Sequence, residues 1–109
     1  MTLNEYQQAA RRTMTLNSEP LTLATYALGL AGEAGEVVEH IKKHIGHGHE
    51  LERLKVAREL GDVIWYAAAI ASVCGLTLDD IATININKLK SRYPDGFSFD
   101  ASQNRTDTK

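Results

Sequence analysis

The chain has little cysteine, little proline and no marked excess of charge of either sign. Its one cysteine, Cys74, excludes an intramolecular disulfide, and its apolar surroundings predict a small buried side chain rather than a nucleophile. The 12 basic and 14 acidic side chains give a net charge of −2, whereas a nucleic-acid binder carries a basic excess that neutralises phosphates. We therefore expect no nucleic-acid partner.

Long apolar runs are also missing. The longest one, residues 63–74, is shorter than the roughly 20 residues that a bilayer requires, so we expect a buried helix there and no membrane partner. Residues 1–5 contain neither the basic nor the apolar region of a secretory signal. The sequence therefore favours a cytoplasmic protein.

The 109 residues fit one domain, which we expect to be all-α and four-helix bundle-like. Apart from Pro20 and Pro94, which bracket the central region, no residue there forbids a helix. Apolar residues at helical spacing predict helices from a Thr2–Glu5 capping box to about residue 15, and over residues 21–46 and 51–75. A fourth helix, capped by Thr77 or Asp79, extends to about residue 93. We expect a loop at 17–20, a turn at 46–49, a domain over 1–97 and a polar, disordered tail over 98–109.

The apolar positions also predict which surfaces are buried. In the second helix they are Ala24, Leu28, Ala31, Ala34, Val38, Ile41 and Ile45. The second half of the third helix is apolar nearly all round, which predicts a central position and contact with another subunit. We therefore expect a homo-oligomer, either a dimer or a tetramer.

Glycines and acids alternate in the second predicted helix. Gly29, Gly32 and Gly35 each cost about 1 kcal/mol relative to alanine in a helix, so their stripe indicates close approach of another helix or a ligand. Glu33 and Glu36, with Glu39 one step further, project from one face. The alternative explanation is that the three glycines serve only tight packing between helices.

The third predicted helix repeats this arrangement of acids within apolar sequence. Glu59 and Asp62 lie at i and i+3, and two such stripes on antiparallel helices can form an oxygen cage for Mg²⁺ or Mn²⁺. A solvated acidic face is the alternative. The Glu-x-x-His pairs of di-iron bundles do not occur, so redox iron is disfavoured.

A basic face follows in the fourth predicted helix, where Asn85, Lys88 and Arg92 lie at i, i+3 and i+7. An amide and two cations can bind phosphate oxygens, although such residues alone are more often an ordinary solvated face. Two further interpretations are open: His40 and His44 could chelate a soft divalent ion, and Trp65 and Tyr66 could stack on a base instead of packing in the core.

Three motifs together carry a family resemblance. They are Gly-Leu-Ala-Gly-Glu-Ala-Gly-Glu-Val at 29–37, Glu-Leu-Gly-Asp-Val-Ile-Trp-Tyr at 59–66, and the Asn-x-x-Lys motif that begins at Asn85 and continues to Phe97. From about Tyr6 to Phe97 the chain resembles the MazG-like nucleotide pyrophosphohydrolases of the all-α NTP pyrophosphatase superfamily. The resemblance implies Mg²⁺-dependent hydrolysis of a nucleoside triphosphate between its α and β phosphates, in a dimer or a dimer of dimers.

The resemblance also assigns roles to residues. It makes Glu33, Glu36, Glu59 and Asp62 the metal ligands, and Asn85, Lys88 and Arg92 the phosphate contacts. The family's first motif often opens with two adjacent acids, but Gly32 precedes Glu33 here, which leaves the number of ions open. Glu39 is a candidate replacement for the lost acid.

Catalysis requires a base and a way to choose substrates. Glu36 or Glu33 would accept a proton from the attacking water, and the sequence does not choose between them. Base and sugar selection would come from outside the motifs, for example from Tyr6, Gln7 and Thr13 or from a neighbouring subunit. The alternatives are a non-catalytic metal- or nucleotide-binding module and a sister activity on phosphoribosyl-ATP, dUTP or dCTP.

Overall fold

The computed structural model describes residues 1–15 and 19–105. These residues contain helices and no strand, which confirms the all-α prediction. The elements are α1 (Leu3–Ala10), the 3-10 helix η1 (Arg11–Thr13), α2 (Pro20–His47), α3 (Arg53–Val73), α4 (Leu78–Arg92) and α5 (Phe99–Gln103). Residues 17 and 18 of the predicted loop lie outside the described residues, and Pro20 already belongs to α2.

Local signals explain where these helices begin and end. The capping box at α1 is confirmed, because Thr2 Oγ1 accepts from the Glu5 N–H at 3.1 Å and Glu5 Oε1 accepts from the Thr2 N–H at 2.9 Å. Pro20 suits the first turn of α2, since its φ is already helical and it has no N–H to leave unpaired. Gly48 ends α2 with a φ of 73°. The helix therefore includes residues 46 and 47, which we expected in the turn.

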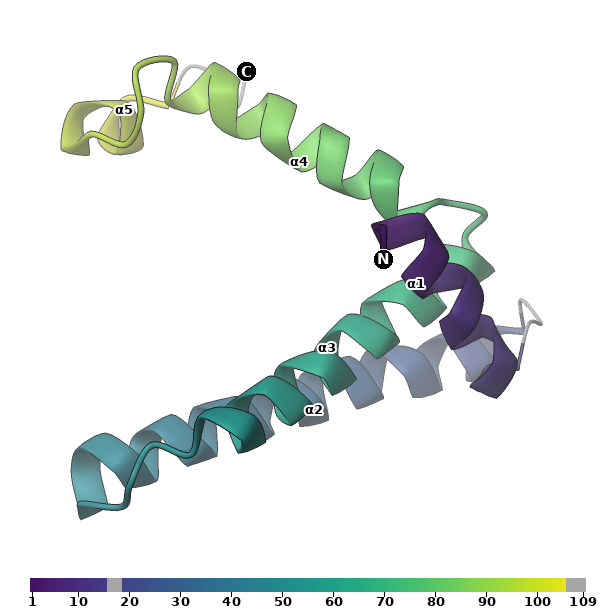
Figure 1. Cartoon of the computed structure of the whole chain (residues 1–109). Coiled ribbons are helices and arrows are strands. Elements are labelled where there is room, and N and C mark those ends of the chain that lie inside the picture. The colour runs from purple at the N-terminus through teal and green to yellow at the C-terminus, as the bar shows by residue number, and fades with distance from the viewer. Residues whose placement is uncertain (16–18, 106–109) are drawn as a thin grey trace. The chain divides into compact units, whose positions relative to one another are not determined.

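The chain divides into two compact units, Met1–Thr77 and Leu78–Lys109. In the first unit, α2 and α3 run antiparallel as a long hairpin, and α1 packs on α3 (Figure 1). Gln7 anchors α1, since its buried Nε2 donates to Ser72 Oγ at 3.0 Å and to the Leu76 carbonyl at 2.9 Å. The two bonds hold the N-terminal helix against the end of α3.

The core of the first unit combines aromatic rings with small residues. The Trp65 ring lies 5.8 Å from that of Tyr26 and 5.1 Å from that of Tyr66, both nearly edge to face. Trp65 Nε1 donates to Thr13 Oγ1 at 3.0 Å, so the indole is held by protein contacts, as the core interpretation requires. The buried residues Ala68, Ala69 and Ala71 confirm the central position of the second half of α3.

Two apolar regions that we expected to be buried are exposed in the single chain. The predicted apolar stripe of α2 is largely solvent-exposed, with Leu28, Val38 and Ile45 at 74%, 66% and 78% exposure, because α2 packs through the neighbouring face that carries Tyr26 and His40. Cys74 is exposed as well, since α3 ends at Val73 and its sulfur lies beyond the packed part of the helix.

The second unit contains α4, α5 and an aromatic turn between them. The Phe97 ring lies 5.4 Å from that of Tyr93 and 6.0 Å from that of Phe99. Within the tail that we expected to be disordered, residues 99–103 form α5, because Ser98 Oγ accepts from the Ala101 N–H at 3.0 Å and caps it. Residues 106–109 of that tail lie outside the described residues.

Within residues 1–15 and 19–105, no helix is both long enough and apolar enough to cross a membrane by itself. Only α3 and α4 taken together, across the bend between them, have the required length and composition.

Candidate metal and phosphate site

The four predicted metal ligands lie on the two helices of the hairpin. Glu33 and Glu36 belong to α2, and Glu59 and Asp62 belong to α3. Two contacts fix how the helices face each other: Gly29 lies against Tyr66, and the Nε2 of His40 accepts from the Glu52 N–H. Between these contacts, the acidic part of α2 falls opposite the acidic part of α3.

Burial separates the four acids into two pairs. Glu33 and Glu59 are partly buried, whereas Glu36 and Asp62 are exposed. One side chain from each helix therefore extends into the hairpin interface and one from each is open to solvent.

Glu59 provides the observation that bears most directly on a cation. Its Oε2 is buried and has no hydrogen-bond partner. A buried carboxylate oxygen without a partner is costly, and a divalent cation is a ligand that would satisfy it. The oxygen-only donor set of the four acids suits Mg²⁺ or Mn²⁺, so the residues present fit such an ion chemically.

The single chain does not gather these acids into a coordination shell. Within residues 1–15 and 19–105, no three His, Cys, Asp or Glu side chains are placed to share a metal ion. The structure therefore brings the acidic stretches to facing helices without closing a cage around one point.

Glu39, the candidate replacement for the missing acid, is engaged elsewhere. Its carboxylate pairs with Lys42 at 3.2 Å and with Lys43 at 3.8 Å. The hydrogen bond from Lys42, followed by the charge of that lysine, lowers the pKa of Glu39. Both neighbours are exposed cations on its own helix, so nothing here directs Glu39 to a metal.

Tyr6 is linked to the acidic stretch in a way that the motifs did not reveal. Partial burial and, after it, the negative charge of Asp62 raise the pKa of Tyr6. The phenol of α1 therefore lies within electrostatic reach of one of the predicted metal ligands. From the sequence we predicted only a role in substrate selection for Tyr6. A contact between α1 and α3 joins residues far apart in the chain, so no local sequence pattern indicates it.

The glycines have different roles. A Cβ at Gly29 would overlap the ring of Tyr66, so this glycine permits close packing of the hairpin. Gly32, Gly35 and Gly61 have open space where a Cβ would be. Tight packing thus explains the first glycine of the stripe and not the others.

The predicted phosphate contacts all lie in the second unit. Asn85 and Lys88 of α4 are exposed, and Arg92 is partly buried with its guanidinium carbon 5.9 Å from the centre of the Tyr93 ring. The aromatic turn therefore holds Arg92 at the end of α4, while the two other side chains are open to solvent.

Comparisons with known proteins identify the family of the chain. The sequence model of the MazG nucleotide pyrophosphohydrolase domain matches residues 21–97, which include all seven predicted site residues. The chain is also similar to the Gene 37 protein of Mycobacterium phage L5, with 36% identity over 87 residues and 76% of each chain covered. No solved structure matches the chain. By the match to the family model, which covers more than half of its length, the chain belongs to the family of MazG nucleotide pyrophosphohydrolase domains.

Proposed function

We propose that the protein hydrolyses (deoxy)nucleoside triphosphates at the α–β bond, with Mg²⁺, to a nucleoside monophosphate and pyrophosphate. One observation supports the proposal best in a chain of this family: Glu59 has a buried oxygen without a partner, and its helix faces a second acidic helix. Non-canonical nucleotides are the proposed substrates, as in a house-cleaning enzyme.

The proposed metal ligands are Glu33, Glu36, Glu59 and Asp62. Mg²⁺, or Mn²⁺ in its place, supplies positive charge that offsets the anionic triphosphate. Glu33 and Glu59, which are partly buried, would hold the ion together with Glu36 and Asp62, which are exposed and accessible from solvent.

The remaining roles follow from charge and proton affinity. Glu36, or Glu33 in its place, accepts the proton of the water that attacks the phosphate. Lys88 and Arg92 stabilise the negative charge that develops on the departing pyrophosphate, and Asn85 donates a hydrogen bond to a phosphate oxygen.

We propose further that the chain works as a homo-oligomer. Leu28 and Val38 of α2 and Leu54 of α3 are at least 66% exposed, and such large apolar side chains on one hairpin are typical of a surface that another subunit covers. Open space at Gly32 and Gly35 would let a second helix approach the backbone of α2. A dimer and a tetramer both satisfy these requirements.

The test is pyrophosphate release from a panel of canonical and modified nucleoside triphosphates, with phosphoribosyl-ATP included, in Mg²⁺, Mn²⁺ or EDTA. We expect metal-dependent release of monophosphate and pyrophosphate by the wild type and loss of turnover in Glu36→Gln, with its helical content unchanged. Glu50→Gln, an exposed acid outside the proposed ligands, is the matched control and should retain activity.

One result would favour a different function. Because the described residues do not close a metal shell by themselves, a non-catalytic nucleotide-binding module is the second candidate. Tight nucleotide binding without any pyrophosphate release, under all three metal conditions, would support that module and contradict the hydrolase. Release from one class of nucleotide alone would instead identify the specificity.

A further inference from the structure

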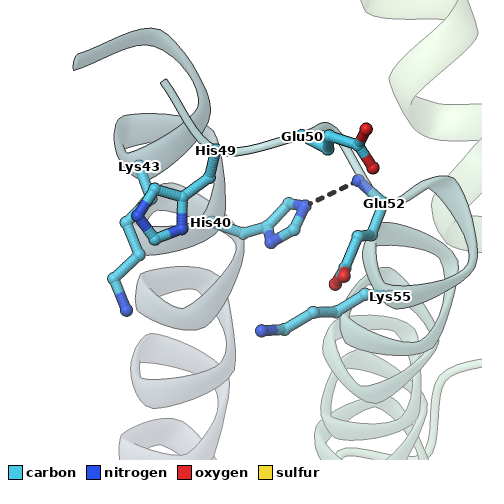
Figure 2. Close-up of a pocket in the computed structure, with 6 residues that line it drawn as sticks. All are labelled: His40, Lys43, His49, Glu50, Glu52 and Lys55. Carbon is cyan, nitrogen blue, oxygen red and sulfur yellow. Dashed lines mark hydrogen bonds between the residues drawn. The ribbon is translucent and has the colours of Figure 1, made fainter. Parts of the chain in front are cut away.

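Two histidines close the connection between α2 and α3 with hydrogen bonds of opposite polarity. His40 Nε2 accepts from the Glu52 N–H at 3.2 Å, and Figure 2 shows the ring pointing across the connection at this amide. His44 Nδ1 lies 2.7 Å from the His49 carbonyl oxygen. A carbonyl can only accept, so His44 is the donor in its bond, whereas His40 is the acceptor in its own.

This difference determines how each contact responds to a proton. The His40 side chain belongs to a residue that is only 8% exposed, and as an acceptor its Nε2 must be unprotonated, which places the ring proton on Nδ1. A protonated imidazole has two N–H donors and no acceptor, so the His40 bond cannot survive protonation. The His44 bond can, because a charged ring still donates from Nδ1.

We propose that His40 is a pH-sensitive clasp, whose protonation releases the N-terminus of α3 from α2. The Glu52 N–H precedes the first turn of α3, and Glu52 makes no side-chain cap at that end of the helix. Without His40 as acceptor, this amide loses its partner within the fold. Acid therefore releases residues 50–52 beside the start of α3, while the bond between His44 and His49 stays in place.

The charged groups around His40 come from α2, from α3 and from the connection between them. A cavity of about 330 Å³ lies beside the ring, and it is lined by Lys43 from α2, by His49 and Glu50 from the connection, by Glu52, and by Lys55 from α3. The two lysines and two glutamates balance formally, and Lys43 is itself paired with Glu39. The polarity of the hydrogen bond is therefore the feature that sets the response to pH.

The same geometry removes His40 from the candidate ligands of a soft metal ion. Its Nε2 is occupied by the Glu52 amide, and its Nδ1 carries the proton of the neutral ring. Chelation by His40 and His44 together, which their i, i+4 spacing permitted, would require this bond to break.

Opening of the clasp has a consequence for the acidic stretches. The contact between His40 and Glu52 lies at one end of the facing acidic stretches, and the contact between Gly29 and Tyr66 lies at the other. Loss of the His40 contact would allow the facing carboxylates to separate and would weaken binding of a divalent cation, an effect that rests on the proposed function. The clasp itself does not depend on that function.

The direct test is amide hydrogen exchange followed by NMR at pH 7.5 and 5.5, expressed as protection factors so that the intrinsic pH dependence of exchange is removed. We expect the protection of the Glu52 amide to fall several-fold at pH 5.5. The His49 amide, which donates to the Lys43 carbonyl at 3.1 Å, is the internal reference and should change much less. Equal protection of Glu52 at both pH values in the wild type would overturn the proposal without any variant.

Two variants assign the effect to one ring. His40→Gln offers an amide oxygen as acceptor that does not titrate, so the Glu52 amide should keep its protection at both pH values. His44→Gln is the matched control and should respond to pH as the wild type does. A pH response of Glu52 that persists in His40→Gln would overturn the proposal.

Mn²⁺ binding separates this inference from the proposed function. We expect the affinity for Mn²⁺ to fall more between pH 7.5 and 5.5 in the wild type than in His40→Gln, since both share the same carboxylates. If the wild type binds Mn²⁺ neither at pH 7.5 nor at pH 5.5, the proposed function is contradicted. The hydrogen exchange of the Glu52 amide would still decide whether His40 is a clasp.

Discussion

The ring of Tyr66 on α3 lies directly against the backbone of Gly29 on α2, where a Cβ would overlap its Cε1 and Cζ atoms. The ring belongs to the aromatic group that Trp65 and Tyr26 also form, so it has little freedom to move away. This contact sets the separation of the two helices about one turn before the first proposed ligand, Glu33.

Gly29→Ala should therefore destabilise the protein. Overpacking at such a contact costs about 1–3 kcal/mol, which outweighs the gain of about 1 kcal/mol in helix propensity. Gly46→Ala is the matched control on the same helix, since a Cβ there meets nothing within 4 Å and should stabilise slightly. Thermal and urea unfolding measure both changes. A Gly29→Ala variant as stable as Gly46→Ala would mean that Tyr66 does not occupy this position.

Glu59→Gln should have opposite effects with and without metal. In EDTA, the variant carries no negative charge at the buried position that lacks a partner, so the Tm should rise or stay level. In Mg²⁺ the wild type should gain stability, by about 2.7 kcal/mol at 100 times its Kd, and the variant should gain less. Differential scanning calorimetry in both solutions provides the comparison. An equal gain in the two proteins would remove Glu59 from the proposed ligands.

Asp62→Asn should lower the pKa of Tyr6 toward the ordinary tyrosine value, because it removes the second of the two causes that raise it. The effect of burial remains, so the return should be partial. Since the pKa of Tyr6 is raised in the folded state, its neutral phenol contributes stability that is fully present below the ordinary tyrosine pKa. That stability is lost as the pH rises from the ordinary pKa through the raised pKa of the folded state. The variant should lose less stability in this alkaline window.

Ultraviolet titration of the phenolate, assigned with a Tyr6→Phe variant, measures this pKa. Asp95→Asn, a change in the second unit, is the control and should leave Tyr6 unchanged. Addition of Mg²⁺ should also lower the pKa of Tyr6 if the ion binds at Asp62. No difference between Asp62→Asn and the control would contradict the proximity of α1 to the acidic stretch.

Val38→Lys should dissociate the proposed oligomer, because it puts a charge into a side chain that is 66% exposed in the single chain and would be buried between subunits. Sedimentation velocity should show the wild type larger than one chain and the variant smaller than the wild type. Gln103→Lys, an exposed change on α5, serves as the control. A monomeric wild type would contradict the interface.

The helices could be predicted well because their ends depend on local chemistry. The capping box at Thr2 acts within a few residues of itself and was predicted, whereas Pro20 and Gly48, which lie at the two ends of α2, were placed in the adjoining loop and turn. The short helix α5 was missed, since five residues give too little periodicity to recognise beside the polar sequence that follows.

The packing face of α2 could not be predicted in the same way. Apolar residues occur on more than one side of this helix, and periodicity gave most weight to the side that carries Leu28 and Val38. The side that packs was selected by the aromatic contacts of Tyr26 with Trp65 and Tyr66, which are about 40 residues away in sequence.

The candidate site was predictable in part for similar reasons. The i, i+3 spacing located the acids on two helices and the basic face on a third, since spacing is a property of one helix. The burial of Glu59 and the proximity of Tyr6 to Asp62 depend on tertiary contacts, and no motif contained them.

The hydroxyl of Tyr26 accepts from the Thr15 N–H at 2.8 Å and donates to the Thr15 carbonyl at 3.1 Å, so one side chain of α2 satisfies both backbone groups of a residue that follows α1 and η1. Trp65 and Ser72 of α3 likewise bond to Thr13 and Gln7. The segment that matches the family model begins at residue 21, yet these partners all precede it. The hairpin therefore depends on residues outside that segment, and excision at residue 21 would leave it with unsatisfied polar groups and an uncovered aromatic core.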